Sequence, residues 1–191
     1  MSSTSESIDV TPKLSHVETE LRQNQELIDI PIGLDRADRE KTVYQLNQLL
    51  ADSIMLKDMY KKHHWQVAGP TFYQIHLMLD KHYAEQVEIV DTIAERIQLL
   101  GGAARGMPAD VAEKTQIPNP PRGRELLTDQ LTRLLQAHEV ICTYARFIAQ
   151  AIGKRGDLGS EDMVVGDVLR VNEFQAWFIA EHLAPIPLEN E

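Results

Sequence analysis

The sequence predicts an all-α protein: a bundle of four long helices with one long connection between the second and the third. Apolar residues recur at helical spacing over four long stretches. Glycine and proline residues cluster between these stretches, where they favour helix ends and turns. No stretch alternates between polar and apolar residues for more than a few positions, so β-strands are not expected.

The first two helices are expected over residues 35–67 and 71–100. In the first, Val43, Leu46 and Leu50 share one face, and a Gly-Pro pair follows the last turn. The second contains neither glycine nor proline and is followed by a Gly-Gly pair, a common C-terminal signal of helices. Both helices therefore end at defined positions.

Residues 101–123 are rich in proline and glycine and are expected to form the long crossover, with one turn of helix at residues 109–114. The third helix is expected over residues 124–152 and the fourth over residues 160–182. Four long helices with a long connection between the second and third are typical of the ferritin-like bundle.

The 191 residues are enough for one domain with a substantial core. We expect residues 35–184 to form the bundle and residues 185–191 a short C-terminal tail. Residues 1–34 are expected to be a flexible N-terminal tail with one short helix near residues 17–27.

Composition narrows the class of protein. No apolar run approaches the ~18–20 residues of a membrane span, and the N-terminus lacks the features of a secretory signal. The only cysteine, Cys142, excludes an intramolecular disulfide framework, suits a reducing cytosol and is expected to be buried. The net charge of −10 disfavours non-specific binding to nucleic acid and is compatible with attracting cations. We therefore expect a cytoplasmic protein.

Candidate metal ligands lie on the second helix. His76 and Asp80 are four residues apart, as are Asp91 and Glu95, so each pair shares one helix face. The two pairs are about 16 Å apart along an α-helix, whereas metal–ligand bonds are about 2 Å long. One straight helix therefore cannot bring both pairs to one ion.

A symmetric dimer removes this difficulty. If two copies of the helix pack antiparallel about a two-fold axis near Glu85 and Gln86, the first pair of one chain faces the second pair of the other. His64, at the end of the first helix, is placed to complete each of the two identical sites. Two imidazoles and three carboxylates suit iron or another first-row divalent metal.

An ordinary structural role accounts for each of these five residues taken alone. A carboxylate pair four residues apart is usually part of a solvated helix face, and an isolated histidine is usually structural. The symmetric spacing favours the metal site only moderately, because two pairs can agree by chance.

A longer motif runs from His64 to Asp80, with the sequence HWQVAGPTFYQIHLMLD, and continues as DTIAER at residues 91–96 and LGG at residues 100–102. It resembles the signature of the Dps family of mini-ferritins, and the resemblance spans roughly residues 30–184. The family implies a ferroxidase centre shared by two-fold-related subunits. Its ligands would be His64, His76 and Asp80 of one chain and Asp91 and Glu95 of the partner.

The resemblance implies more about assembly and chemistry. The family forms hollow homo-dodecamers that oxidise Fe(II), commonly with hydrogen peroxide rather than oxygen, and store the Fe(III) mineral inside. Trp65 would lie beside the centre, and its alternative role is that of a core aromatic at the helix end. Zinc at the same site is the alternative to iron.

Other polar residues near the motif have simpler expected roles. His63 and His82 are further imidazoles; His82 points away from His76 on the helical wheel and is expected at the surface or an interface. Lys61 and Lys62 are expected to be solvated. Between the third and fourth helices, acidic residues either line a pore, as in the family, or cap the fourth helix; these are Asp157, Glu161 and Asp162.

The sequence disfavours two alternative functions. Ferritins and bacterioferritins hold a diiron site inside one bundle through Glu-x-x-His motifs, and this chain contains none. A DNA-protecting shell with little ferroxidase activity is the second alternative. Residues 1–34 carry two basic and six acidic side chains, so the tail should repel DNA and binding is expected to be weak or absent.

Overall fold

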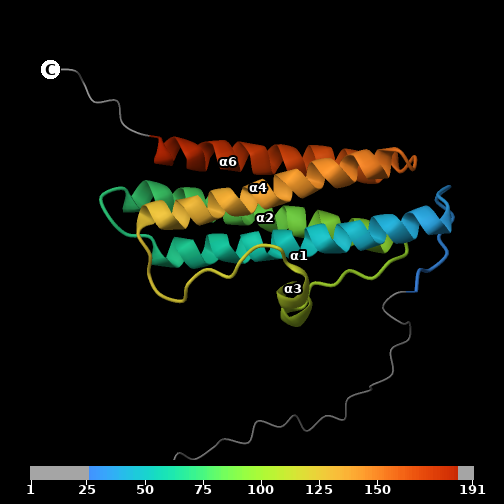
Figure 1. Ribbon diagram of the computed structural model, residues 1–191, viewed down its shortest axis with the longest axis horizontal. Helices are drawn as coiled ribbons and strands as arrows, with labels where there is room; N and C mark the ends of the chain where they lie inside the picture. Colours follow the sequence, from blue (N-terminus) through green and yellow to red (C-terminus); the bar gives the residue numbers. More distant parts are fainter. Residues whose placement is uncertain (1–25, 185–191) are drawn as a thin grey trace, which may run out of the picture.

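The computed structural model describes residues 26–184, and all regular structure in this range is helical. The long helices lie side by side along one axis (Figure 1). The elements are α1 (Arg36–Gln66), α2 (Phe72–Leu99), α3 (Pro108–Lys114), α4 (Leu127–Gly153), α5 (Leu158–Met163), the π-helical segment η1 (Val164–Leu169) and α6 (Arg170–Leu183).

The last three elements follow one another without a break and form the fourth rod of the bundle. α1 packs against α2 and α4, and α4 packs against α6. The long connection from α2 to α4 carries the short helix α3, which packs against α1 outside the bundle (Figure 1). The predicted ferritin-like four-helix bundle with a crossover is thus confirmed.

Each helix end lies within three residues of the position expected from glycine, proline and apolar periodicity. The short helix expected near residues 17–27 lies almost entirely outside the described residues, and residues 26 and 27 are not helical. The division of the chain into two tails and a bundle stays a prediction. No helix within residues 26–184 is both long and apolar enough to cross a membrane.

The core is formed by the apolar stripes that the four rods turn towards one another. Burying each such leucine or isoleucine side chain contributes about 1.5–3 kcal/mol. Cys142 lies among these residues, as expected, and burial raises the pKa of its thiol to about 11. Fully buried members include Leu46, Leu49, Leu56, Leu79, Ile93, Leu134, Ile141 and Ile148.

The C-terminal end of α2 is tied to the segment that precedes α1. The N–H of Gly102 donates to the carbonyl of Ile97, and the N–H of Ile28 donates to the carbonyl of Gly101, both at 2.9 Å. Arg39 joins the two segments, because its Nη1 donates to the carbonyl oxygens of Leu100 and Ile28. This junction requires Gly101 to adopt a φ of 84°.

Replacing Gly101 by alanine will lower the free energy of unfolding by about 2 kcal/mol more than replacing Gly33 by alanine. Both glycines have a positive φ, but a Cβ on Gly101 would overlap the carbonyl oxygen of Ile28, whereas a Cβ on Gly33 meets nothing within 4 Å. Urea denaturation of both variants measures the difference. Equal destabilisation would show that the junction accommodates the added methyl group without a loss of stability.

Candidate metal centre

The short connection between α1 and α2 brings two histidines face to face. His64 lies in the last turn of α1 and His76 near the start of α2. Their ring centroids are 3.7 Å apart and their planes are inclined by 23°. The His64 side chain is 12% exposed, and His76 is also partly buried.

Backbone hydrogen bonds fix which nitrogen of each ring carries the proton. The Nδ1 of His64 lies 3.0 Å from the carbonyl oxygen of His76, and the Nδ1 of His76 lies 3.0 Å from the carbonyl oxygen of His64. A carbonyl only accepts, so each Nδ1 must donate. The lone pair of each neutral ring is therefore on Nε2, the nitrogen left for a metal ion, and both rings are held in place before any metal arrives.

Asp80 lies one turn after His76, and its Oδ1 is 3.9 Å from the Nε2 of His64. The Nζ of Lys61 is only 2.6 Å from the same oxygen, and the hydrogen bond to Lys61 is the main cause that lowers the pKa of Asp80. The expectation that Lys61 and Lys62 are merely solvated was wrong. Lys61 pairs with Asp80, and Lys62 donates to Gln66 at 2.8 Å.

Asp91 and Glu95 lie farther along α2 and are exposed, and their side chains form no hydrogen bond or ion pair with any other residue of the described range. Within residues 26–184 of one chain, no three His, Cys, Asp or Glu side chains are grouped so that they could hold a metal ion. One chain thus brings His64, His76 and Asp80 near one another, and it leaves the acidic pair apart from them.

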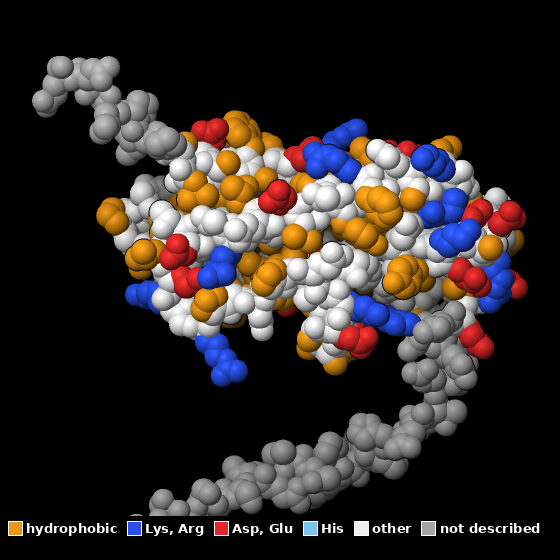
Figure 2. Space-filling view, viewed as in Figure 1, with side chains coloured by type: hydrophobic (Ala, Val, Ile, Leu, Met, Phe, Trp, Pro, Cys, Tyr) orange, Lys and Arg blue, Asp and Glu red, His pale blue; other side chains and the backbone are white. Residues whose placement is uncertain are grey.

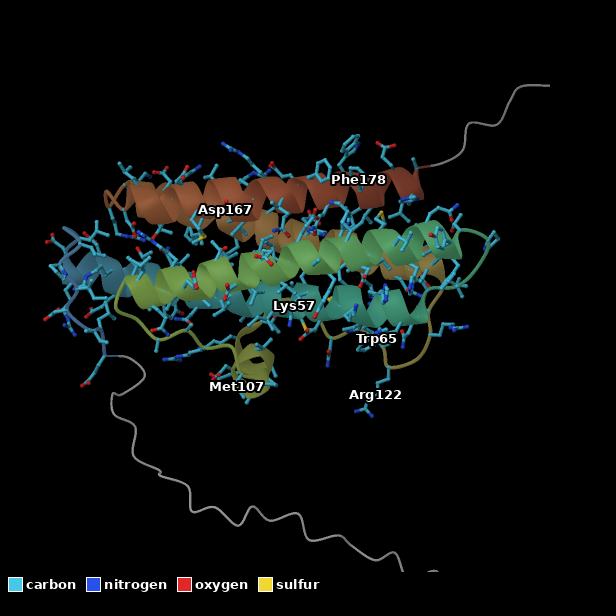
Figure 3. The ribbon with its side chains drawn as sticks, turned by 180° about the vertical axis from the view of Figure 1, so that it is seen from behind. Lys57, Trp65, Met107, Arg122, Asp167 and Phe178 are labelled. Atoms are coloured by element: carbon cyan, nitrogen blue, oxygen red, sulfur yellow. The ribbon has the colours of Figure 1, made fainter. Side chains whose placement is uncertain are left out.

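The side of α2 that faces away from the bundle forms an exposed stripe, here called the outer stripe of α2. Its members recur every three or four residues, and α2 is nearest the viewer in Figure 3, with no other described helix over it. The outer stripe consists of Tyr73, Leu77, Asp80, Ala84, Val87, Asp91 and Glu95. Candidate ligands thus lie towards both ends of one uncovered helix face, with small apolar residues between them.

Comparison with known proteins places this geometry in a family. Residues 43–188 match the ferritin-like domain family. The fold superposes on DpsC from Streptomyces coelicolor with a TM-score of 0.88 and 46% sequence identity, covering 90% of this chain and 100% of that chain. The chain belongs to the Dps family.

Two relatives extend this assignment. An uncharacterised protein of Kitasatospora aureofaciens is 42% identical over 146 residues, which are 76% of this chain and 97% of that protein. A DNA protection during starvation protein of Agrobacterium fabrum is 29% identical over 138 residues, which are 72% of this chain and 85% of that protein. Membership of the Dps family within the ferritin-like superfamily supports iron storage or DNA protection in general terms.

Trp65 follows His64 directly and is 70% exposed, at the end of α1 (Figure 3). Its alternative role as a core aromatic was therefore wrong. An exposed indole beside the histidine pair is compatible with a surface that a second subunit covers.

The acidic residue at the start of the fourth rod has the capping role. Asp157 is buried and accepts a hydrogen bond from the N–H of Ser160 at 3.0 Å. It also pairs with the guanidinium of Arg96 at 2.6 Å. The expected N-cap is confirmed, and the family's pore role for the acidic residues that follow stays a prediction.

The structure places a second group of histidines inside this Dps-family bundle. His82 is 1% exposed and His138 is 0% exposed, and both lie near the hydroxyl of Tyr60. The expectation that His82 lies at the surface was wrong, because the helix face opposite the candidate metal ligands is the face that packs in the core. A usable signal was that His82 and Gln86 continue the apolar stripe of α2 at core positions.

Proposed function

We propose that this chain is an iron-oxidising and iron-storing mini-ferritin of the cytoplasm. Twelve copies would form a hollow shell, oxidise Fe(II) to Fe(III) at centres shared by two subunits, and store the mineral inside, which protects against oxidative stress. The observation that carries the proposal is the half-site on one chain. Two imidazoles with free Nε2 atoms lie face to face, and the Asp80 carboxylate lies 3.9 Å from the Nε2 of His64, at the uncovered side of α2.

The outer stripe of α2 supports the pairing with a second copy. In an antiparallel pair about the proposed axis, Ala84 of one chain faces Val87 of the other, so small side chains meet where the helices come closest. The same register puts Asp91 opposite Asp80 and Glu95 opposite His76 of the partner subunit. Each half-site would then gain the two carboxylates that its own chain leaves unpaired.

The ligand set suits the oxidation of iron. Carboxylates offset the charge that an iron ion gains on passing from Fe(II) to Fe(III), and neutral imidazoles hold its position. Hydrogen peroxide takes one electron from each of two Fe(II) ions and, with two protons, gives two water molecules. This consumes both reactants of hydroxyl-radical formation. Oxygen is the alternative oxidant, and zinc is the alternative metal at the same ligands.

The test follows the absorbance of Fe(III) after Fe(II) is added with peroxide or with oxygen, while size-exclusion chromatography reports the shell. The double variant His76→Ala, Asp80→Ala should oxidise iron at least ~100-fold more slowly with an unchanged shell, because the half-site is removed. A matched control replaces Gln74 and Glu88 by alanine, two exposed residues of α2 outside the outer stripe. Undiminished oxidation in the first variant would refute the assignment.

The second candidate is a DNA-protecting shell with little ferroxidase activity, as the name of the Agrobacterium relative suggests. The charge distribution disfavours it, since residues 1–34 carry a net charge of −4. On the face shown in Figure 2, basic side chains are intermingled with acidic and apolar ones. A shell that retards DNA in a salt-sensitive manner and does not oxidise iron would favour this candidate.

Lys61→Met should tighten the binding of Co(II), a spectroscopic substitute for Fe(II), about two- to five-fold. A metal ion at the half-site must displace the ammonium group that lies 2.6 Å from Asp80. The control is Lys57→Met, because Lys57 also lies on α1 and pairs with an aspartate, Asp58, away from the site. Weaker Co(II) binding in Lys61→Met would show that Lys61 supports the site rather than competing with the metal.

A further inference from the structure

A layer of polar side chains crosses the interior of the bundle. Tyr60 of α1, His82 of α2, His138 of α4 and Asn172 of α6 are all between 0% and 1% exposed. Polar groups in such a place destabilise the fold unless hydrogen bonds satisfy them. In this layer the hydrogen bonds also have a fixed direction.

Asn172 sets the donor-to-acceptor direction of these hydrogen bonds. Its Nδ2 donates to the carbonyl of Val168 at 2.8 Å, which turns its Oδ1 towards His138. That oxygen is 2.9 Å from the Nδ1 of His138 and only accepts, so Nδ1 carries the hydrogen. Burial lowers the pKa of His138 to about 3, and the neutral ring therefore has its lone pair on Nε2.

Tyr60 completes the chain of hydrogen bonds. Its hydroxyl oxygen lies 2.5 Å from the Nε2 of His138, so the phenol donates its one hydrogen there. The same oxygen lies 3.2 Å from the Nδ1 of His82, which must then be the donor. Burial, with a smaller contribution from Glu85, raises the pKa of Tyr60 well above 10, so the phenol keeps its proton at rest.

All five tyrosines lie within residues 26–184, and among them Tyr60 alone has an imidazole as hydrogen-bond acceptor. The hydroxyl of Tyr144 donates to a backbone carbonyl, Tyr44 and Tyr73 are largely exposed, and Tyr83 is half-buried with the Nζ of Lys61 over its ring. Oxidation of a phenol is easiest when its proton leaves with the electron, because the cation radical is a strong acid. The Nε2 of His138 is placed to receive that proton, and the Nδ1–H···Oδ1 bond to Asn172 stabilises the resulting imidazolium.

We propose that Tyr60 is a redox-active tyrosine that supplies the second electron to peroxide when only one Fe(II) occupies the neighbouring centre. The position supports this, because Tyr60 lies one helical turn before His64 on α1, about 6 Å along the axis. The inference rests on the proposed ferroxidase function. It adds an electron donor, located inside one subunit, to a metal centre that two subunits share.

The step balances. Fe(II) becomes Fe(III), and Tyr60 becomes a neutral phenoxyl radical. The phenol O–H bond breaks as an N–H bond forms at the Nε2 of His138. Hydrogen peroxide accepts both electrons, its O–O bond breaks, and two hydroxide ions form. A later Fe(II) returns an electron to the phenoxyl radical, and the proton returns from His138. A single Fe(II) thus reduces peroxide without releasing a hydroxyl radical.

The first test loads intact shells with one Fe(II) per centre under anaerobic conditions, adds one peroxide, and records electron paramagnetic resonance after freeze-quenching. We expect a tyrosyl radical whose spectrum narrows when the protein contains ring-deuterated tyrosine. The radical should be lost in Tyr60→Phe, with more hydroxyl radical trapped, and fall several-fold in His138→Gln. It should persist in Tyr44→Phe and Tyr144→Phe. A radical unchanged in Tyr60→Phe, or lost in Tyr144→Phe, would overturn the proposal.

The second test separates this inference from the proposed function. Metal-free shells are photo-oxidised with a ruthenium tris-bipyridyl sensitiser and persulfate, and the radical of wild-type protein is compared with that of Tyr60→Phe. If shells fail to oxidise iron even at two Fe(II) per centre, the proposed function fails, and a radical absent only from Tyr60→Phe still shows that Tyr60 is redox-active. If iron is oxidised rapidly but neither test yields a radical on Tyr60, the inference is wrong.

Discussion

Shells assembled from two inactive variants will recover about a quarter of the wild-type rate of iron oxidation. One variant carries His76→Ala and Asp80→Ala, and the other carries Asp91→Ala and Glu95→Ala. In a dimer of one subunit of each, one shared centre has lost four of its five ligands and the other keeps every ligand. Random mixing makes about half of the dimers mixed, and half of their centres are intact.

The experiment co-expresses the two variants with different affinity tags, purifies shells that carry both tags, and compares them with shells of each variant alone. A matched control mixes the His76→Ala, Asp80→Ala variant with His64→Ala. These substitutions fall in the same half-site, so no mixed dimer has an intact centre and no activity should return. Recovery in both mixtures, or in neither, would exclude a centre built from the two halves proposed above.

Much of the fold follows from local signals in the sequence. Gly69 and Pro70 end α1, and Gly101 ends α2 with a backbone conformation that suits glycine. Apolar periodicity then defines the four rods. The half-site can also be predicted from the sequence, because His64 and His76 flank a short turn and Asp80 follows one helical turn later.

Contacts between helices cannot be predicted from such local sequence signals. A helical wheel gives the direction of a side chain relative to its own helix, and it does not say which neighbour that direction meets. Lys61 therefore looked solvated although Asp80 of the next helix lies beside it. The reciprocal backbone hydrogen bonds of His64 and His76 likewise depend on how the ends of α1 and α2 meet.

The internal polar layer escapes prediction for a different reason. The helical wheel puts His82 away from the face of the metal ligands, and that direction alone does not distinguish the surface from the core. Leu79 and Ile89 lie on the same side of α2 and are buried, so a residue at that position had to enter the core. Polar residues at core positions of a helix are the sequence signal for such a layer.

Acid will destabilise the folded protein through this layer. Burial lowers the pKa of His138 to about 3, below the ordinary value of 6.5. Between these pH values, His138 therefore binds a proton in the unfolded chain and stays neutral in the folded chain. The contribution of His138 to stability is therefore complete above pH 6.5 and is lost as the pH falls towards 3. At pH 4 the loss amounts to roughly 3 kcal/mol.

Urea denaturation at pH 7 and pH 4.5, at one fixed protein concentration, measures this dependence. His138→Gln should be less stable than the wild type at pH 7, because the Tyr60 and Asn172 hydrogen bonds are altered, and it should lose less stability on acidification. The control His182→Gln replaces an exposed histidine of α6 and should keep the pH dependence of the wild type. Acid sensitivity that is equal in all three proteins would mean that His138 is already protonated in the folded state. Its Nε2 would then have no lone pair for the proton of Tyr60, so this measurement also tests the hydrogen-bond direction on which the redox role of Tyr60 depends.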